Sequence, residues 1–356
     1  MNSLLLAPEL FASEGGITRI LRLYLKAMSE IALPDGRVSF LSLNDSMVDE
    51  SDLRRYSAGN VDQWEVCSKK KVHFVMAARR LSRRSNTLVC GHVAQLPVAW
   101  AVSLLRPSIK YYLVAHGIEV WRPFTLLERR ALKGATKIFC VSEFTRQRLL
   151  ENCNLRPERL VVLFNALDPY MDPVTAVPPI LGDPIILAIS RLTSSDNYKG
   201  IGHLIAAMPA VCEAAPNARL RIVGRGNGMP SLQSQVRKLN VSKNVEFLGY
   251  RSDEELKTEF EGCRLFALPS EKEGFGLVYL EAMAHGRPCL GARSGGVPEV
   301  ITPETGILVD YGNVPQIAQA MLTGITRTWD IGLLRGRAES FSYLRFKDRL
   351  ESVLKP

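Results

Sequence analysis

Short apolar segments alternate with longer amphipathic ones along most of the chain. In the first half, five short runs rich in aliphatic and aromatic residues are expected to form strands, at 38–43, 87–90, 110–115, 137–141 and 160–164. Between them, apolar positions recur at helical spacing, as in 17–32, 96–105 and 125–133. This alternation predicts a parallel sheet with helices on both faces.

A proline-rich stretch interrupts the alternation. Residues 168–184 contain five prolines and few periodic apolar positions, which is typical of a linker between domains. The alternation then resumes, with strands expected at 185–189, 219–223, 245–248, 264–268 and 288–291. We therefore predict an N-terminal domain over 1–167, a linker over 168–184, a C-terminal domain over 185–336, and a C-terminal helix over 337–356 that is amphipathic from 337 to 354.

The expected fold class is α/β, with two Rossmann-like doubly wound domains in tandem. The length of 356 residues agrees with two domains. In open parallel sheets, ligands bind beyond the carboxyl ends of the strands. Two such domains facing each other are expected to form a deep cleft.

The composition indicates a globular protein, with 46% hydrophobic and 23% charged residues. Seven cysteines form no CxxC pair and their number is odd, which favours buried free thiols in a reducing cytosol over disulfides or a zinc site. The N-terminal residues lack the basic head and long apolar core of a signal peptide. The uncharged stretch 85–105 approaches membrane-spanning length, but it divides better into a strand, a loop and a helix.

The formal net charge of +9 favours an anionic partner. Nucleic acid, a phosphate-bearing substrate and an anionic membrane surface all fit the charge alone. No motif of stacking aromatic residues supports nucleic acid. The basic run 69–84 places four arginines on one stripe of a helix and Phe74, Ala77, Ala78 and Leu81 on another. The basic stripe is either a solvated helix face or a surface that docks to an anionic inner leaflet.

Two glycine-containing turns follow expected strands. Gly15 and Gly16 lie between a further strand expected near the N-terminus and a helix, where free backbone N–H groups bind anions. The segment Ser294-Gly295-Gly296-Val297-Pro298-Glu299 is a second turn of this kind, with a proline at a helix start. For both, an ordinary structural turn is the alternative.

Two further loops of the second half carry cations. Arg191 and Lys199 flank the loop after its first strand, and their charges suit a pyrophosphate, with two solvated surface cations as the alternative. The segment Gly224-Arg225-Gly226-Asn227-Gly228 also follows a strand, but it does not match the GxGxxG spacing of dinucleotide-binding proteins. A nicotinamide-dependent enzyme is therefore disfavoured.

The most informative segment is 269–286. Glu273 lies on a glycine-bearing loop just before a helix that begins near Gly276, and Glu281 lies about one turn inside that helix. The free N–H groups at a helix start and the helix dipole favour a negative ligand. Two carboxylates beside such a helix end suit the hydroxyl groups of a sugar and a ribose. Taken singly, Glu273 is explained by helix capping and Glu281 by a solvated helix position. The combined pattern of residues 269–286 argues against both interpretations.

The run from Glu273 to Glu281 resembles the E-x7-E signature of retaining GT-B glycosyltransferases, specifically family 4, the group 1 glycosyl transferases. The resemblance extends in order across nearly the whole chain. The other matching segments are Gly15-Gly16-Ile17, His116-Gly117, Val141–Thr145, Asn165–Asp168, Arg191 with Lys199-Gly200, Gly224–Gly226, Pro269-Ser270 and Gly295–Glu299.

The resemblance implies roles for the matched residues. Gly16, Arg191 and Lys199 would contact the pyrophosphate of a nucleotide-sugar donor. His116 and Glu273 would contact its sugar, and Glu281 would hold the ribose. The base would lie near Gly249 and Tyr250, and the terminal helix would cross back to the N-terminal domain. The implied catalytic residues are Glu273, His116, Arg191 and Lys199, and the implied donor-binding residues are Gly16, Arg191, Lys199, Gly224, Tyr250, Glu273, Phe275, Gly276, Leu277 and Glu281.

The sequence also departs from the family pattern. Ser190 stands where glycine is common, and Ala166 replaces a frequent glycine. The loop from Arg191 to Lys199 is longer than in many members.

The implied function is metal-independent, retaining transfer of a hexose from a UDP- or GDP-linked sugar. The acceptor would be a glycan or a lipid-linked glycan in bacterial-type surface polysaccharide or glycoconjugate synthesis. The chain has no D-x-D metal motif, so cations and a helix start would stabilise the leaving diphosphate, and no cofactor is expected. The expected location is the cytoplasm or the cytoplasmic face of the membrane. The alternative is a non-catalytic partner that binds a nucleotide-sugar within a glycosyltransferase complex.

Overall fold

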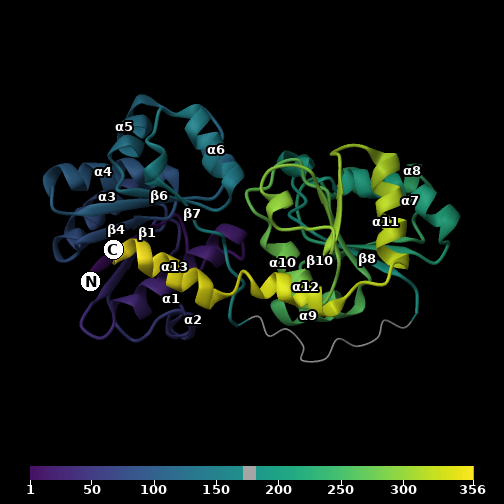
Figure 1. The fold of residues 1–356 in the computed structure, drawn as a ribbon, viewed down its shortest axis with the longest axis horizontal. Coiled ribbons are helices and arrows are strands. Elements are labelled where there is room, and N and C mark those ends of the chain that lie inside the picture. The colour runs from purple at the N-terminus through teal and green to yellow at the C-terminus, as the bar shows by residue number, and fades with distance from the viewer. Residues whose placement is uncertain (171–181, 356) are drawn as a thin grey trace. The chain divides into compact units, whose positions relative to one another are not determined.

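The computed structural model describes residues 1–170 and 182–355 and divides into two compact units. Unit 1 contains residues 1–168 and 342–356, and unit 2 contains residues 169–341. Each unit has one parallel sheet covered by helices, as the hydrophobic pattern predicts (Figure 1). Most of the predicted linker, residues 171–181, lies outside the described residues.

The sheet of unit 1 has seven parallel strands in the order β3-β2-β1-β4-β5-β6-β7. The strands are β1 (Ser3–Ala7), β2 (Val38–Ser42), β3 (Val61–Val66), β4 (Thr87–Cys90), β5 (Lys110–Ala115), β6 (Lys137–Cys140) and β7 (Leu160–Val162). The helices are α1 (Gly16–Ala32), α2 (Glu50–Arg55), α3 (Lys71–Leu81), α4 (Leu96–Leu105), α5 (Leu126–Gly134), α6 (Glu143–Asn152) and α13 (Tyr343–Leu354).

The strand order places the helices of unit 1 on two faces. From β1 to β3, each new strand is added toward one edge of the sheet. After β3 the chain returns to the other side of β1, and β4 to β7 are added toward the opposite edge. Because such crossovers are right-handed, α1 and α2 cover one face and α3 to α6 cover the other. Phe74, Leu96, Leu132 and Leu149 from the second group share one buried core. The direction changes between β1 and β4, and ligands bind at such a point in open sheets.

The sheet of unit 2 has six parallel strands in the order β10-β9-β8-β11-β12-β13. The strands are β8 (Ile185–Ile189), β9 (Arg219–Val223), β10 (Val245–Gly249), β11 (Leu265–Leu268), β12 (Cys289–Ala292) and β13 (Gly306–Val309). The helices are α7 (Ile201–Ala214), α8 (Met229–Lys238), α9 (Asp253–Gly262), α10 (Leu277–Ala284), α11 (Val314–Thr326) and α12 (Ile331–Glu339).

The terminal segment differs from the prediction. The single helix expected over 337–354 is two helices, α12 and α13, separated at 340–342. Phe341 is buried within unit 2, with its ring 5.4 Å from that of Phe275, while Ser342 has extended backbone at the start of α13. Residues 337–341 therefore belong to unit 2, and the predicted boundary at 336 is wrong by five residues.

Two other observations concern the apolar helices and the cysteines. None of the helices in the described part of the chain is long and apolar enough to cross a bilayer. The uncharged stretch 85–105 contains β4, a short turn and α4, which confirms its division into strand, loop and helix. All seven cysteines are free thiols, and six of them are buried.

Candidate functional site

The glycines after β9 allow two loops of unit 2 to pack backbone against backbone. Gly224 has φ of 140°, and a Cβ on it would lie 1.8 Å from the carbonyl oxygen of Ser190. A Cβ on Gly226 would lie 2.2 Å from the carbonyl carbon of Leu192. Only glycine permits such close approach. The segment that resembles a dinucleotide fingerprint therefore supports the loop that begins with Arg191.

Two more glycines fix the loop that carries Glu273. Gly200 has φ of 78°, and a Cβ on it would lie 2.3 Å from the carbonyl oxygen of Pro269. Gly295 has φ of 60°, and its Cβ would lie 2.1 Å from the carbonyl oxygen of Glu273. The N–H of Gly296 donates to that same oxygen at 2.8 Å. Three of the predicted motifs thus meet at one loop beyond the carboxyl ends of the strands.

Lys199 and Glu273 form a close ion pair at this meeting point. The Nζ of Lys199 lies 2.6 Å from Oε2 of Glu273, and the two side chains are only 18% and 17% exposed. Burial lowers the pKa of Lys199, but the carboxylate of Glu273 more than offsets this, so the pKa lies above its usual value. The lysine is therefore charged at neutral pH. The close approach at Gly200 places Lys199 beside Glu273 despite the long preceding loop.

The start of α10 provides free backbone donors beside this pair. Gly276 occupies the N-cap position with φ of 95°, and no side chain caps the helix or places an acidic group in its first turn. The N–H groups of the first turn thus have no capping acceptor, which favours an anion there. Phe275 is buried and anchors the preceding loop. Glu281 is only 8% exposed, so its reading as a solvated helix residue is wrong.

Arg191 lies on the exposed side of its loop. Its side chain is 74% exposed, and Nε lies 3.4 Å from Oδ2 of the buried Asp196. Thr193 donates a hydrogen bond of 2.7 Å to the same carboxylate oxygen. Asp196, which the sequence analysis missed, therefore orients Arg191 while leaving the guanidinium open to a ligand.

The predicted base-binding region also has an exposed aromatic ring. Tyr250 follows β10 and is 53% exposed. The guanidinium carbon of Arg225 lies 5.6 Å from the centre of its ring, a cation–π contact. Arg225 thus holds the ring from one side.

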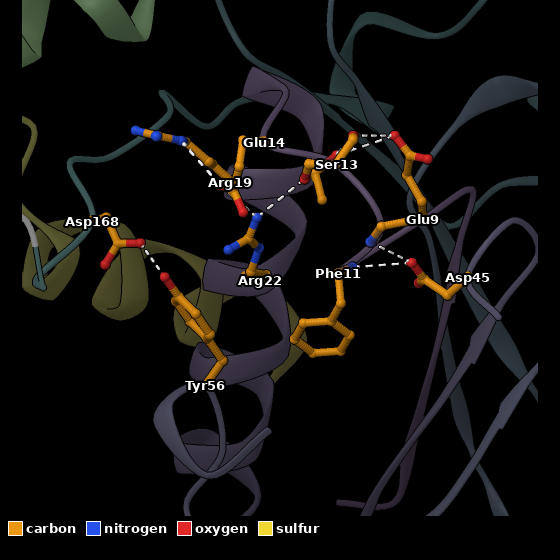
Figure 2. Close-up of polar contacts among 11 residues, drawn as sticks. Glu9, Phe11, Ser13, Glu14, Arg19, Arg22, Asp45, Tyr56 and Asp168 are labelled. Carbon is orange, nitrogen blue, oxygen red and sulfur yellow. Dashed lines mark hydrogen bonds and ion pairs between the residues drawn. The ribbon is translucent and has the colours of Figure 1, made fainter. Parts of the chain in front are cut away.

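In unit 1, the turn before α1 has an uncapped helix start like that of α10. Gly15 is the N-cap residue and makes no side-chain capping bond, and both Gly15 and Gly16 are exposed. Figure 2 shows Glu14 beside this turn, with its carboxylate 3.0 Å from the guanidinium of Arg22. Arg22 also donates to the carbonyl oxygen of Ser13 at 3.2 Å. These contacts hold the turn against α1.

A buried carboxylate sets the conformation of the loop that precedes this turn. Asp45 is fully buried, and its carboxylate accepts hydrogen bonds from the backbone N–H groups of Leu10, Phe11 and Ala12 at 2.7, 3.1 and 2.6 Å. Figure 2 shows Asp45 beside Phe11. Charge-assisted bonds of this kind are among the stronger hydrogen bonds in proteins. The sequence analysis missed Asp45, since only its position just after β2 hints at this role.

His116 follows β5 at the same edge of the unit 1 sheet. Its Nε2 lies 2.8 Å from the carbonyl oxygen of Gly91. Because a carbonyl only accepts, Nε2 carries the hydrogen and Nδ1 is the unprotonated nitrogen. Burial lowers the pKa of His116 to about 4. The ring is therefore neutral near pH 7, with Nδ1 ready to accept a hydrogen bond.

Glu119 and His92 accompany His116, and the sequence analysis missed both. Oε1 of Glu119 accepts a hydrogen bond of 2.6 Å from the backbone N–H of His116. Burial raises the pKa of Glu119, and the nearby His92 opposes that shift. Burial likewise lowers the pKa of His92 against the opposing effect of Glu119. His92 follows β4, so its position after the strand next to β5 was the available signal.

The predicted residues thus fall into two groups. Arg191, Lys199, Gly224, Tyr250 and the 273–281 block lie on loops or helix starts of unit 2, and Gly16 and His116 lie in unit 1. The structure brings Lys199 and Glu273 into direct contact. Among the described residues there is no group of three or more His, Cys, Asp or Glu side chains that could hold a metal ion.

Two parallel-sheet Rossmann-like domains of this kind define the GT-B class of glycosyltransferases. A structure of HepE from Anabaena, solved with UDP and glucose, has a TM-score of 0.82, 20% sequence identity and coverage of 99% of both chains. A family model described as glycosyl transferases group 1 matches residues 183–327, and one described as glycosyltransferase family 4 matches residues 38–170. The chain belongs to glycosyltransferase family 4.

Curated relatives match parts of the chain. A GDP-mannose-dependent monoacylated alpha-(1-6)-phosphatidylinositol monomannoside mannosyltransferase of Corynebacterium glutamicum is 38% identical over 148 residues, which are 39% of this chain and 37% of that protein. A D-inositol 3-phosphate glycosyltransferase of Corynebacterium aurimucosum is 30% identical over 226 residues, 58% of this chain and 53% of that protein. The chain therefore aligns with between about a third and just over half of the length of these two relatives.

Proposed function

We propose that the chain transfers a hexose from a nucleotide-diphosphate sugar to a glycan or lipid-linked acceptor, with retention of configuration and without a metal ion. The observation that carries this is the Lys199–Glu273 pair beside the uncapped start of α10. A cation and free N–H groups suit a leaving diphosphate, and a carboxylate beside them suits sugar hydroxyls. The names of the mannosyltransferase relatives support GDP-mannose, and a structure of HepE in complex with UDP-glucose supports UDP-glucose, as the donors to test first.

The proposed reaction is a displacement on one face of the sugar. The bond between the anomeric carbon and the β-phosphate oxygen breaks, and the acceptor oxygen bonds to that carbon. The acceptor proton passes to an oxygen of the leaving diphosphate. Lys199, Arg191 and the N–H groups of α10 would stabilise the charge that develops on this diphosphate. Nδ1 of the neutral His116 would accept a hydrogen bond from a hydroxyl of the donor sugar.

A panel of nucleotide-sugars tests the donor class. We expect one UDP- or GDP-linked sugar to raise the Tm of the purified chain, because a ligand at about 100 times its Kd stabilises the folded state by about 2.7 kcal/mol. The same donor should release free nucleoside diphosphate when an acceptor glycan or glycolipid is added. Nucleoside monophosphates serve as the control. Protection without turnover across a broad acceptor panel would favour the non-catalytic binding partner, and no protection by any donor would contradict the proposal.

Metal independence has its own test. The chain has no D-x-D motif, and Arg191 and Lys199 offer fixed positive charge for the leaving group. We expect transfer to continue at an unchanged rate after treatment with EDTA. Loss of transfer in EDTA, with recovery on adding manganese, would show that a metal ion performs this role.

A further inference from the structure

The net positive charge of the chain comes from one segment. Between Glu65 and Glu119 there is no Asp or Glu, while nine Lys and Arg residues occur. The rest of the chain carries 36 Lys and Arg against 36 Asp and Glu, so this segment accounts for the whole formal charge of +9. Most of these cations lie on and around α3 and the short turn at 82–84 that follows it.

The cations on this helix are exposed and largely unpaired. Arg80 pairs with Glu65. In the described part of the chain, no carboxylate lies within ion-pair distance of the others, which are Lys69, Lys70, Lys71, Arg79, Arg83 and Arg84, all of them exposed. Three lysines at the start of a helix oppose its dipole, and the first turn of α3 has no acidic residue to balance them. They lie where helix stability alone would place acidic side chains.

The outward face of α3 is also apolar. Phe74, Ala77, Ala78 and Leu81 are buried in the core, as the spacing predicts. On the opposite side of the helix, Val72, Val75 and Met76 are 75%, 49% and 65% exposed. A helix face that meets only water normally carries polar residues at these positions. If the outward side of α3 were only a solvated helix face, the exposure of these three apolar side chains would have no explanation.

The same surface continues onto the end of α4. Arg106, just after α4, donates hydrogen bonds to the carbonyl oxygens of Ser82 and Ser85, which ties the end of α4 to the turn after α3. Leu104 and Leu105 at this end are 61% and 64% exposed. Apolar side chains flanked by unpaired cations are the pattern of helices that lie in the interface of an anionic bilayer.

We propose that the outward face of α3, with the end of α4, docks the chain to an anionic lipid bilayer. Val72, Val75 and Met76 enter the boundary between headgroups and acyl chains, and the surrounding lysines and arginines contact the lipid phosphates. The inference rests on the proposed function in one respect, because docking brings the transferase to acceptors that are lipid-linked. This docking surface lies on the face of the unit 1 sheet opposite to α1 and α13. A bilayer bound there would therefore not cover α13.

Flotation with large unilamellar vesicles tests the docking. We expect the full chain to float with vesicles of phosphatidylglycerol and phosphatidylcholine at low salt, and not with phosphatidylcholine alone. Val72→Ser with Met76→Ser should weaken binding at least tenfold. Lys70→Gln with Lys71→Gln should weaken it by about 25-fold, since each cation near such a surface contributes about fivefold.

One exposed apolar substitution and one pair of exposed lysine substitutions serve as controls. Leu344→Ser on α13 removes an equally exposed apolar side chain from the other face of unit 1, and Lys238→Gln with Lys243→Gln removes two exposed lysines from unit 2. Both should float like the unaltered chain. Because the substituted side chains point to solvent, all variants should keep the unaltered Tm.

Three results would overturn the docking. The first is equal recovery with neutral and anionic vesicles, and the second is a control that loses binding as much as the α3 variants. The third is full binding by the Val72 and Met76 variant, which would show simple attraction to polyanions. Flotation needs no donor, so failure here with intact sugar transfer to a water-soluble acceptor rejects the docking and leaves the proposed function standing.

Discussion

Lys199→Ala is expected to lower kcat by about 10² to 10³, the cost of losing one preorganised group that stabilises developing charge. The side chain is 18% exposed and contacts Glu273 at 2.6 Å, so its removal also leaves a half-buried carboxylate without its cation. That carboxylate would then repel the leaving diphosphate. Arg191→Ala should cost about 10², because the exposed guanidinium acts on the same charge from the outer side of the site. Steady-state kinetics with the donor found in the panel would measure both.

Lys272→Ala is the matched control for these variants. Lys272 lies on the same loop as Glu273 but is exposed, and it should keep the unaltered kcat. Lys199→Arg keeps the charge but not the compact ammonium group, so we expect it to recover part of the loss. A Lys199→Ala enzyme within a few-fold of the unaltered rate would show that this residue does not meet the leaving group.

Glu273→Gln and Glu281→Gln are expected to fail in different ways. Glu273 contacts the cation proposed to meet the diphosphate, so it should face the reacting sugar, where a contact that tightens in the transition state changes kcat. We expect kcat to fall by about two orders of magnitude. Free nucleoside diphosphate should bind at least as tightly as before, because Lys199 no longer shares its charge with a carboxylate.

Glu281→Gln should instead weaken binding of both donor and free diphosphate by about tenfold to a hundredfold, the usual cost of a lost charged hydrogen bond. The effect on kcat should be smaller, since the ribose does not react. Calorimetry with the free diphosphate, together with donor kinetics, separates the two variants. Glu271→Gln, an exposed neighbour on the same loop, is the control. Normal turnover by Glu273→Gln, or equal loss of diphosphate binding in the two variants, would contradict these roles.

Strands that are buried on both faces could be located closely from the sequence. The strands predicted at 87–90, 110–115 and 185–189 have the bounds seen in the structure, because nearly continuous apolar runs mark such strands. The strand predicted at 219–223 also has the bounds seen in the structure, although it contains two arginines. The analysis missed β3, whose positions are all half-buried or exposed and whose Trp64 is 44% exposed. It also missed β13, which lies at the edge of the unit 2 sheet. A strand at the edge of a sheet offers a weaker apolar signal.

The residues of the candidate site likewise divide into those that a local sequence motif reveals and those whose role depends on tertiary contacts. Residues in local motifs, such as Glu273 and Lys199, were found because chemistry and spacing lie together in the chain. Asp45 was missed because it acts on backbone N–H groups more than 30 residues away. Glu119 was missed because its importance comes from burial and from its bond to the backbone of His116. Such roles depend on which loops the fold brings together, and no short sequence pattern encodes that.

The return of α13 to unit 1 bears on how the chain is made. Tyr24 on α1 packs against Phe346 on α13, with ring centres 5.0 Å apart, and Lys347 pairs with Glu30 at 3.1 Å. A ribosome completes residues 1–168 long before it adds 342–356, and domains generally fold in the order in which they emerge. Unit 1 is therefore the first to be translated and the last to be finished. During that interval the part of α1 that α13 covers, around Tyr24, remains exposed to water and to chaperones while all of unit 2 is synthesised.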